Sequence, residues 1–470
     1  MTATLLWLRQ DLRLRDNAAL QAACARGAPL IPVYIWSPEE EGAWPPGAAS
    51  RWWLHHSLEA LGHELRLRGL RLILRRGRVL ETLRTLIGDT GAGAVFWNRR
   101  YEPAAEQCSR EMRQALSRDG LEARSFNSCL LIEPAELLNQ SDRPYQVYTP
   151  FLRKVLQSLA PPAPGGVPRS LRAPSRWPSS LPLDALGLLP RVRWYAGLAA
   201  SSQPGEAGAL RRLKRFIAED LGGYERTRDT PALAGTSRLS PHLHFGEIGP
   251  RQLWHALAGQ RHSALFRREL IWREFGYYLL HHFPQSTDVP LHEEFVHFPW
   301  RHQLEGLAAW AAGETGIPMV DAGMRELWAT GLMHNRVRMI CASFLVKNLL
   351  LPWQEGARWF WDTLVDADLA SNTLNWQWVA GCGADAAPYF RIFNPVLQGR
   401  RFDPRGEYVR RWIPALAALP DKLVHTPWHA DQPPQSYPSP IIDLVRSRQA
   451  ALDAYAAMRA ERLRRAPRLV

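Results

Sequence analysis

The sequence has few cysteines, and their spacing fits neither a metal site nor a disulfide framework. Five cysteines are scattered over 470 residues, without a Cys-x-x-Cys pair or a Cys/His cluster at the spacing of zinc ligands. Long apolar runs are also missing. No stretch of about 18 apolar residues occurs, and charges between Arg9 and Asp16 interrupt the N-terminus. We therefore expect a soluble, cytoplasmic protein with reduced cysteines, no membrane span and no bound metal.

Negative charge is the scarcer sign in this chain. Its 45 Asp and Glu residues are outnumbered by 58 Lys and Arg residues, which gives a formal net charge of +13. This excess favours a polyanionic partner, because neutralising phosphates releases counterions. A basic surface with no dedicated partner is the plainer interpretation, and charge alone leaves it open. The 20 tryptophans are a second unusual count, because each indole N–H needs a partner when it is buried.

The N-terminal third has the pattern of alternating strands and helices. We expect an α/β domain over residues 1–156, built on a doubly wound parallel sheet of the Rossmann-like type. No Gly-x-Gly-x-x-Gly follows the first strand-sized run, so the usual dinucleotide fingerprint is absent. The predicted strands are the apolar runs 5–8, 30–36, 70–74 and 94–97, and the predicted helices include 51–68 and 104–116.

The remainder of the chain changes in composition twice. Residues 157–208 are rich in Pro, Ser, Gly and Ala, which predicts a long interdomain connector that packs over the surface. Residues 209–470 lose the strand pattern and gain helical periodicity, most clearly between Asp321 and Leu351. They predict a second, all-α domain. No internal repeat of solenoid length is present.

Three segments of the helical half contain polar residues that a core would not select. Residues 236–240 offer hydroxyls and N–H groups at a helix start, which suits a phosphate, although an ordinary N-cap is the simpler explanation. Glu269 and Arg273 share a helix face with a tryptophan, and a solvated ion pair is the alternative there. Asp366 and Asp368 lie in an apolar stretch. Buried ion pairs contribute little to stability, so such acids more often hold a ligand.

Five segments in this order resemble the photolyase/cryptochrome family, and the likeness covers nearly the whole chain. The opening Trp7-Leu8-Arg9-Gln10-Asp11-Leu12-Arg13 is similar to the start of that family's α/β domain, and Ser50-Arg51-Trp52-Trp53-Leu54 is most similar to class III photolyases and plant cryptochromes. The five segments are Thr236-Ser237-Arg238-Leu239-Ser240, Trp272-Arg273-Glu274-Phe275, Met333-His334-Asn335-Arg336-Val337-Arg338-Met339, Asp366-Ala367-Asp368-Leu369-Ala370-Ser371-Asn372 and Trp376-Gln377-Trp378.

The resemblance implies a helical domain that binds FAD and uses blue light to split cyclobutane pyrimidine dimers in DNA. Arg338 would pair with Asp366 beside the isoalloxazine, and Asp368 would bind its polar edge. Asn372 would face flavin N5, where an amide adds no negative charge against a reduced, anionic flavin. The residues implied to bind FAD are Tyr224, Thr236, Ser237, Arg238, Leu239, Ser240, Arg273, Asn335, Arg338, Asp366, Ala367, Asp368 and Asn372.

The same resemblance implies how a flipped-out dimer is held. Glu269 would hydrogen-bond the pyrimidine carbonyl edge and Met339 would pack beneath the dimer, so these two residues and Asn372 are the implied catalytic residues. His334 is followed by Asn335 rather than by a second histidine, which favours a cyclobutane dimer over a (6-4) photoproduct. The residues implied to contact DNA are Arg228, Glu269, Trp272, Asn335, Arg336, Met339, Trp378 and Arg391.

Trp376, Trp353 and Trp300 lie where the family's electron-transfer chain lies, although core packing is the alternative for each tryptophan. A light-harvesting chromophore is also expected in the α/β domain. The chain departs from the folate motif after Tyr101-Glu102-Pro103 and from the deazaflavin motif at Arg100 and His244. The class III likeness favours 5,10-methenyltetrahydrofolate, with 8-hydroxy-5-deazaflavin or FMN as alternatives. Its implied contacts are Glu41, Arg51 and Trp52.

Two other functions stay open at this point. A cryptochrome-like blue-light sensor would use the same FAD for signalling, but about 30 residues after Pro440 leave little room for a signalling tail. A basic nucleic-acid-binding module with structural tryptophans does not explain Asp366, Asp368 and Asn372 in one apolar stretch. We expect a monomer that acts on dimer-containing DNA in the cytoplasm and joins the nucleoid when bound.

Overall fold

The computed structural model describes residues 1–465, and the chain divides into two compact units. Unit 1 comprises residues 1–222, 237–284 and 365–369. Unit 2 comprises residues 223–236, 285–364 and the chain from residue 370 onward. Each unit therefore combines segments that are distant in the sequence. The predicted domains, 1–156 and 209–470 with a connector between them, follow chain order and stay a prediction.

Unit 1 contains a five-stranded sheet in which all neighbouring strands are parallel, in the order β3-β2-β1-β4-β5. This order confirms the predicted doubly wound, Rossmann-like class. Strands β1 and β2 are buried at every position, which explains their unbroken apolar runs. The strands are β1 (Thr4–Leu8), β2 (Leu30–Trp36), β3 (Ile73–Arg76), β4 (Ala94–Asn98) and β5 (Glu122–Phe126).

Two strands differ from the sequence pattern, and both lie at an edge of the sheet. The predicted strand 70–74 begins only at Ile73 and continues into Arg75 and Arg76. Strand β5 was missed, because Glu122-Ala123-Arg124-Ser125-Phe126 has no apolar run and its side chains are exposed or half-buried. An edge strand needs less apolar surface than a central one, so hydrophobicity alone misplaced the bounds of β3 and gave no signal for β5.

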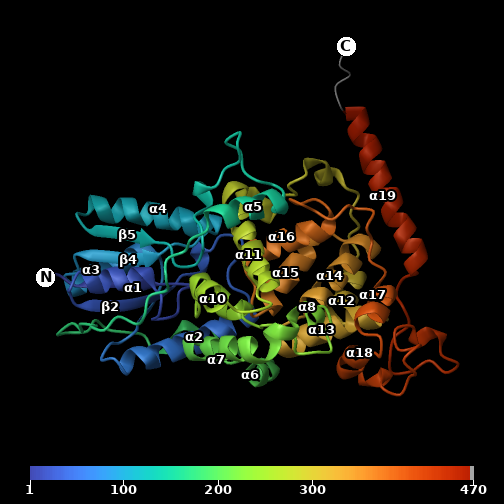
Figure 1. Cartoon of the computed structure of the whole chain (residues 1–470), viewed down its shortest axis with the longest axis horizontal. Helices are drawn as coiled ribbons and strands as arrows, with labels where there is room; N and C mark the ends of the chain where they lie inside the picture. Colours follow the sequence, from blue (N-terminus) through green and yellow to red (C-terminus); the bar gives the residue numbers. More distant parts are fainter. Residues whose placement is uncertain (466–470) are drawn as a thin grey trace, which may run out of the picture. The chain divides into compact units, whose positions relative to one another are not determined.

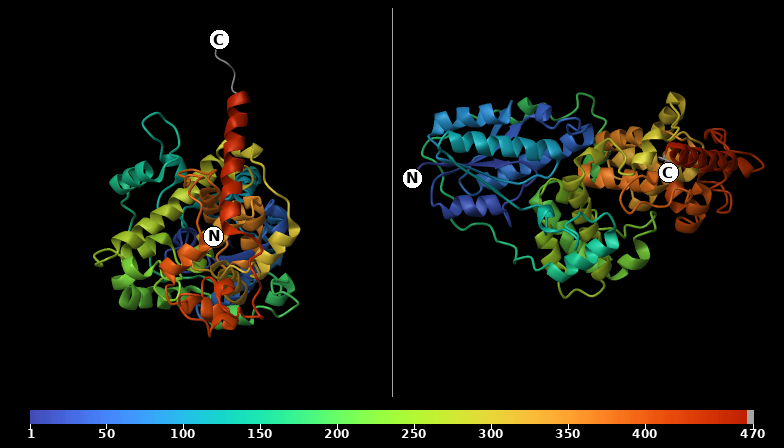
Figure 2. Two further views of the ribbon diagram at one scale, coloured as in Figure 1. Left: turned by 90° about the vertical axis from the view of Figure 1, so that its right-hand side faces the viewer. Right: turned by 90° about the horizontal axis from the view of Figure 1, so that it is seen from above.

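Helices cover both faces of this sheet (Figures 1 and 2). Residues of α3 and α4 share one core with alternate residues of β1, β2 and β4, such as Leu5, Val33 and Trp97. Helix α1 contacts β1 and β4, and Asn17 accepts a hydrogen bond from Leu20 N at its start. The helices are α1 (Ala18–Ala25), α2 (Ala48–Arg66), α3 (Val79–Thr90) and α4 (Pro103–Arg118).

The predicted connector runs along the sheet domain and is held there by backbone hydrogen bonds. Leu30 N donates to Arg172 O at 2.8 Å, and Leu181 N donates to Leu74 O at 3.0 Å. Two short helices, η3 (Leu183–Leu186) and α6 (Ala196–Ser201), interrupt its extended path. The Pro-rich segment is therefore an ordered, mostly extended part of unit 1.

The rest of unit 1 is helical and is joined to the sheet domain by a buried carboxylate. Glu247, with 0% exposure, accepts hydrogen bonds from Trp53 Nε1 at 3.1 Å and Gly205 N at 2.6 Å, and also contacts Ser57 and His242. It thus links α2 to the start of α7. These helices are α5 (Tyr148–Ser158), α7 (Glu206–Arg215), α9 (Ser240–His244), α10 (Pro250–Ala256) and α11 (Ala264–His282).

Unit 2 is all-helical, as predicted for the second half of the chain. Helix α13 (Pro318–Thr330) contacts α12 (Leu304–Ala312), α14 (Asn335–Ser343), α17 (Pro395–Phe402) and α18 (Glu407–Trp412) (Figure 1). The other helices used below are α8 (Tyr224–Thr227), α15 (Trp353–Thr363), α16 (Leu369–Ala380) and α19 (Leu444–Arg465).

The helical stretch expected between residues 321 and 351 is broken in two. Gly331 has φ +67° and ends α13, because that left-handed conformation favours glycine. Helix α14 then starts after His334 and continues into a π-helical turn, η8 (Phe344–Asn348). No helix of the part of the chain described, residues 1–465, has the length and the hydropathy needed to span a membrane.

Candidate active site

The hydroxyl-rich segment 236–240 leads into α9, but its side chains do not cap that helix. Ser240 Oγ instead donates to Asp366 Oδ2 at 2.6 Å. Arg212 Nε donates to Ser237 O at 2.7 Å, and Arg238 has φ +50°, which is uncommon outside glycine. The ordinary N-cap interpretation is therefore wrong for Ser240. Its hydroxyl is committed to a buried carboxylate.

Asp368 is a second buried acid of unit 1, with 7% exposure. Its carboxylate accepts a hydrogen bond from Tyr277 OH, and its Oδ2 lies 3.6 Å from His244 Nδ1. Burial raises the pKa of Asp368, but His244, Arg273 and Tyr277 outweigh burial and hold that pKa well below its usual range. An ionised Asp368 therefore connects α9, α11 and the start of α16.

Sequence reasoning missed Tyr277 and His244. The available signal for Tyr277 was its place four residues after Arg273 on α11, one turn along the same face. The guanidinium of Arg273 lies 4.7 Å from the Tyr277 ring centroid. In the sequence, His244 stands out only as a departure from the deazaflavin motif. In the structure its ring contacts the carboxylate of Asp368.

Helix α11 also fixes the loop that follows β5. Arg273 Nη1 donates to Cys129 O at 2.8 Å. Glu274 accepts hydrogen bonds from Leu131 N at 2.8 Å and Ile132 N at 3.3 Å, and burial raises its pKa to about 7. Arg273, predicted to bind FAD, thus has a structural contact within unit 1.

Trp272 and Glu269 lie one turn apart on α11, as their spacing predicted. The Trp272 indole stacks on Tyr148 with ring centroids 3.5 Å apart and planes at 10°. One face of the indole is therefore covered, and only the other face can stack on a base. Both Trp272 and Glu269 are half-buried.

Unit 2 contains a cavity of about 610 Å³, referred to below as the Trp378 cavity. Four residues predicted to contact DNA line it: Trp378, Arg336, Met339 and Arg391. Arg336 Nη2 forms an ion pair of 2.9 Å with Asp229, which also lines the cavity. The structure therefore brings half of the predicted DNA-contacting residues to one hollow in the surface of unit 2.

His334 takes part in the helix start beside this cavity. Its Nδ1 accepts a hydrogen bond from Arg336 N at 3.1 Å and caps α14. Burial lowers the pKa of His334 to about 4, so the ring is neutral near pH 7. A neutral ring whose Nδ1 is already occupied is a poor proton donor to a lesion.

The three predicted electron-transfer tryptophans all lie in unit 2. Trp353 and Trp376 are buried and Trp300 is half-buried. Trp376 lies against α15, because a methyl group at Gly356 would come within 2.0 Å of its Cη2. Trp353 is three residues earlier on α15. Trp310, which was not predicted, has its ring centroid 6.3 Å from that of Trp376.

The remaining predicted FAD contacts are distributed over the chain. Asn372 Nδ2 donates to Ala357 O at 3.0 Å, which orients the amide and leaves Oδ1 as an acceptor. Arg338 Nε donates to Met333 O at 2.8 Å. Its pairing with Asp366 stays a prediction. Tyr224 of unit 2 is buried, and the Arg228 guanidinium lies 5.4 Å from its ring centroid. Also in unit 2, Thr236 is half-buried and Asn335 is exposed. Leu239 and Ala367 are buried in unit 1.

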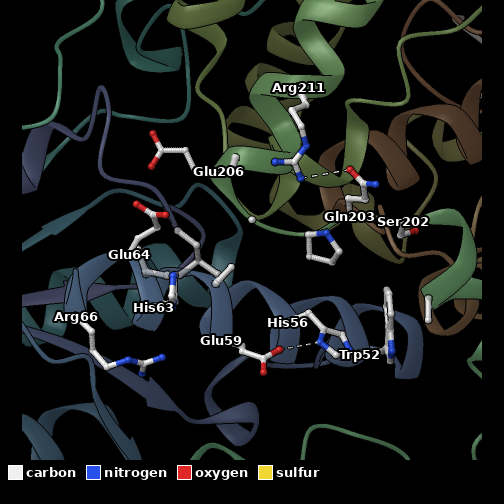
Figure 3. Close-up of a pocket in the computed structure, with 18 residues that line it drawn as sticks. Trp52, His56, Glu59, His63, Glu64, Arg66, Ser202, Gln203, Glu206 and Arg211 are labelled. Atoms are coloured by element: carbon white, nitrogen blue, oxygen red, sulfur yellow. Dashed lines mark hydrogen bonds and ion pairs between the residues drawn. The ribbon is translucent and has the colours of Figure 1, made fainter. Parts of the chain in front are cut away.

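A second cavity, of about 570 Å³, lies in unit 1 between α2 and residues 199–211. Figure 3 shows Trp52, His56 and Glu59 along one helix, with Gln203 and Arg211 across the hollow from it. His56 Nδ1 lies 3.3 Å from Glu59 Oε2, and Arg211 Nη2 donates to Gln203 Oε1 at 3.3 Å. The cavity has an aromatic end at Trp52 and polar walls.

Of the three predicted antenna contacts, only Trp52 lines this cavity. Glu41 is bound by Arg100 through two hydrogen bonds of 2.6 and 2.8 Å. Arg51 is half-buried, and its Nε has no hydrogen-bond partner. Glu41 is thus already neutralised by another residue of the α/β domain.

Lys347 is a buried residue that sequence reasoning did not single out. Its exposure is 1%, and its Nζ donates to Ala380 O and Tyr389 O, each at 3.2 Å. The ammonium also lies 3.4 Å from the Tyr389 ring centroid. Lys347 therefore joins the end of α16 to the segment that leads to Arg391. Burial lowers the pKa of Lys347 to about 7.

Comparison with known proteins gives consistent matches over nearly all of the chain. The family described as DNA photolyase matches residues 4–169, and the FAD binding domain of DNA photolyase matches residues 266–457. Deoxyribodipyrimidine photo-lyase of Agrobacterium fabrum is 50% identical over 97% of this chain and 98% of that protein. The crystal structure of a class III photolyase from Agrobacterium tumefaciens has a TM-score of 0.95 and 48% identity, covering 98% of both chains. Cryptochrome-1 of Arabidopsis thaliana is 37% identical over 97% of this chain and 70% of that protein.

The Lys347 contacts predict a pH-dependent stability. In the unfolded chain the pKa of the Lys347 ammonium is about 10.4. Between pH 7 and about pH 10.4 the unfolded state therefore binds more protons than the folded state. The free energy of unfolding of the wild type should therefore rise relative to Lys347→Met, by about 2 kcal/mol from pH 7 to pH 9. Urea unfolding of both proteins at several pH values measures this difference, and parallel pH profiles would contradict the assignment.

Proposed function

We propose a function from the premise that the chain belongs to the photolyase/cryptochrome family. The protein is then a deoxyribodipyrimidine photo-lyase, an enzyme that repairs cyclobutane pyrimidine dimers under blue light. The main structural support is the Trp378 cavity, which combines an indole, a thioether and several guanidinium groups. Such a cavity suits an unstacked base pair flanked by phosphates. We infer that the protein acts as a monomer on cytoplasmic DNA.

The residues present fit the FAD that the matched domain implies. Asp366 and Asp368 are buried acids, and carboxylate oxygens can accept hydrogen bonds from the polar donor groups of a ligand. The backbone at Arg238, which leads into α9, suits a phosphate-bearing ligand, while the hydroxyl of Ser240 orients Asp366. When bound, FAD would supply the light-driven electron-transfer chemistry that splitting of the dimer needs.

The protein's own residues hold the dimer, and none of them needs to transfer a proton to it. Splitting a cyclobutane ring breaks two carbon–carbon bonds without net proton transfer. Glu269 would hydrogen-bond the pyrimidine carbonyl edge, and Met339 would provide an apolar floor. Asn372, oriented by Ala357 O, would offer its Oδ1 toward the flavin. The neutral His334 supports this assignment over a (6-4) photoproduct.

The decisive assay is blue-light repair of DNA carrying either a cyclobutane dimer or a (6-4) photoproduct. We expect the wild type to repair only the cyclobutane dimer. Glu269→Ala should lower the repair yield by about tenfold, because a hydrogen bond to a charged group contributes about 1.5 kcal/mol or more. Glu305→Ala, which removes an exposed glutamate of α12, is the matched control and should repair normally.

If the wild type photoreduces its flavin but leaves both lesions intact, repair is the wrong function. The alternative, a cryptochrome-like light sensor, would then be favoured, and the 37% identity to Cryptochrome-1 of Arabidopsis thaliana supports that alternative.

We further propose that Trp376, Trp353 and Trp300 deliver electrons to the flavin. Trp376→Phe should abolish photoreduction while FAD stays bound, because phenylalanine is much harder to oxidise than tryptophan. Trp310→Phe is a matched control, since Trp310 is buried against Trp376 but lies outside the proposed chain. Absorbance under blue light with a reductant measures both rates. Equal rates in wild type and Trp376→Phe would exclude this route.

For the antenna we propose 5,10-methenyltetrahydrofolate, with Trp52 as an aromatic contact in the cavity of Figure 3. The cavity is within the range of about 300–1,000 Å³ that is usual for such ligands. Mass spectrometry of the small molecules released from the purified protein should detect the folate. Trp52→Ala should reduce its content without lowering the FAD content. Release of 8-hydroxy-5-deazaflavin or FMN would contradict this choice.

A further inference from the structure

The Trp378 cavity is lined by more positive charge than its predicted DNA contacts account for. Besides Arg336 and Arg391, the side chains of Arg401 on α17 and Arg448 on α19 line it, against the single acid Asp229. Four guanidinium groups around one hollow repel each other unless an anion lies between them. Neither Arg401 nor Arg448 belongs to the segments that carry the family resemblance.

These arginines differ in whether the protein already neutralises them. Arg336 is engaged by Asp229 at 2.9 Å, and its guanidinium lies 4.5 Å from the Phe402 ring centroid. For Arg391, Arg401 and Arg448, no carboxylate lies within ion-pair distance anywhere in residues 1–465. Their charges are therefore available to an external anion.

The position of Arg448 is fixed by the way α19 is attached to unit 2. Asp443 Oδ1 accepts hydrogen bonds from Val445 N at 2.8 Å and Arg446 N at 2.9 Å, which caps the helix start. One residue before Arg448, Ser447 Oγ accepts a hydrogen bond from Asn348 Nδ2 at 3.0 Å, and Asn348 itself lines the cavity. The base of the Arg448 side chain is therefore held at the cavity wall.

A second contact attaches α19 to the segment that carries Arg391. Tyr455 of α19 stacks on Tyr389 with ring centroids 4.7 Å apart and planes at 12°. Tyr389 lies in the segment that Lys347 holds, two residues before Arg391. Arg391 and Arg448 thus extend from a common framework, which lowers the entropy cost of binding one ligand with both.

We propose that Arg401 and Arg448 bind backbone phosphates of the damaged DNA, so that α17 and the first turns of α19 form part of the DNA surface. This inference rests on the proposed repair function and assigns that function two further positioning residues. A guanidinium fork binds two phosphate oxygens, and both side chains are exposed, so binding entails little desolvation. The neighbouring Trp378 and Phe393 supply flat surfaces for the unstacked bases.

The test is the salt dependence of binding to a duplex that contains one cyclobutane dimer, measured by fluorescence anisotropy from about 50 to 200 mM salt. The slope of log K against log salt concentration is negative, and each lost phosphate contact reduces its magnitude by about 0.9. We therefore expect Arg401→Ala and Arg448→Ala each to reduce the magnitude of the slope by about that amount, and Arg448→Lys to restore it. Arg459→Ala is the matched control, because Arg459 is an exposed arginine of α19 that does not line the cavity.

Repair of the dimer should be unchanged in the control variant Arg459→Ala, since Arg459 does not line the cavity. Equal slopes for Arg448→Ala, Arg459→Ala and wild type would overturn the inference while leaving the repair function intact. If the wild type shows no preference for dimer-containing DNA, the repair function fails, and this inference fails with it.

Discussion

The ionised carboxylate of Asp368 is the interaction on which the elements around the proposed flavin site depend. A buried charge is tolerated only when neighbouring groups hydrogen-bond or neutralise it. Here the neighbours come from α9 and α11, through His244, Tyr277 and Arg273. Because these helices are distant in sequence from Asp368, the carboxylate acts as a tie between them. The same requirement explains why Asp366 receives the hydroxyl of Ser240.

Buried acids of unit 1 and two sets of cations in unit 2 differ in how the protein neutralises them. In unit 1 the buried carboxylates of Glu247 and Asp368 are satisfied by local donors. In unit 2, the partners of the buried Lys347 are carbonyl groups and a ring, and the Trp378 cavity has four guanidinium groups against the single carboxylate of Asp229. Burying Lys347 without a carboxylate beside it costs free energy, which indicates a role beyond stability.

The sequence predicted what depends on local pattern and missed what depends on distant contacts. Central strands were visible because both of their faces are buried, whereas the polar edge strand β5 left no apolar signal. The family resemblance located Trp378 and Arg391, which the structure gathers at one cavity. It could not locate Arg448, because an exposed arginine on a basic helix has the same local pattern whether or not it borders a cavity. Lys347 was missed for the related reason that its burial is a tertiary property.

The charge of the Trp378 cavity also bears on the choice between repair and light sensing. Both functions require a flavin and a path for electrons, so Asp366, Asp368 and the buried tryptophans are compatible with either. A sensor that passes its signal to a protein has no need of unneutralised guanidinium groups around an aromatic hollow, and their mutual repulsion would only destabilise it. Retaining Arg391, Arg401 and Arg448 at one cavity is explained when a polyanion binds there. The electrostatics of unit 2 therefore favour repair of DNA over signalling.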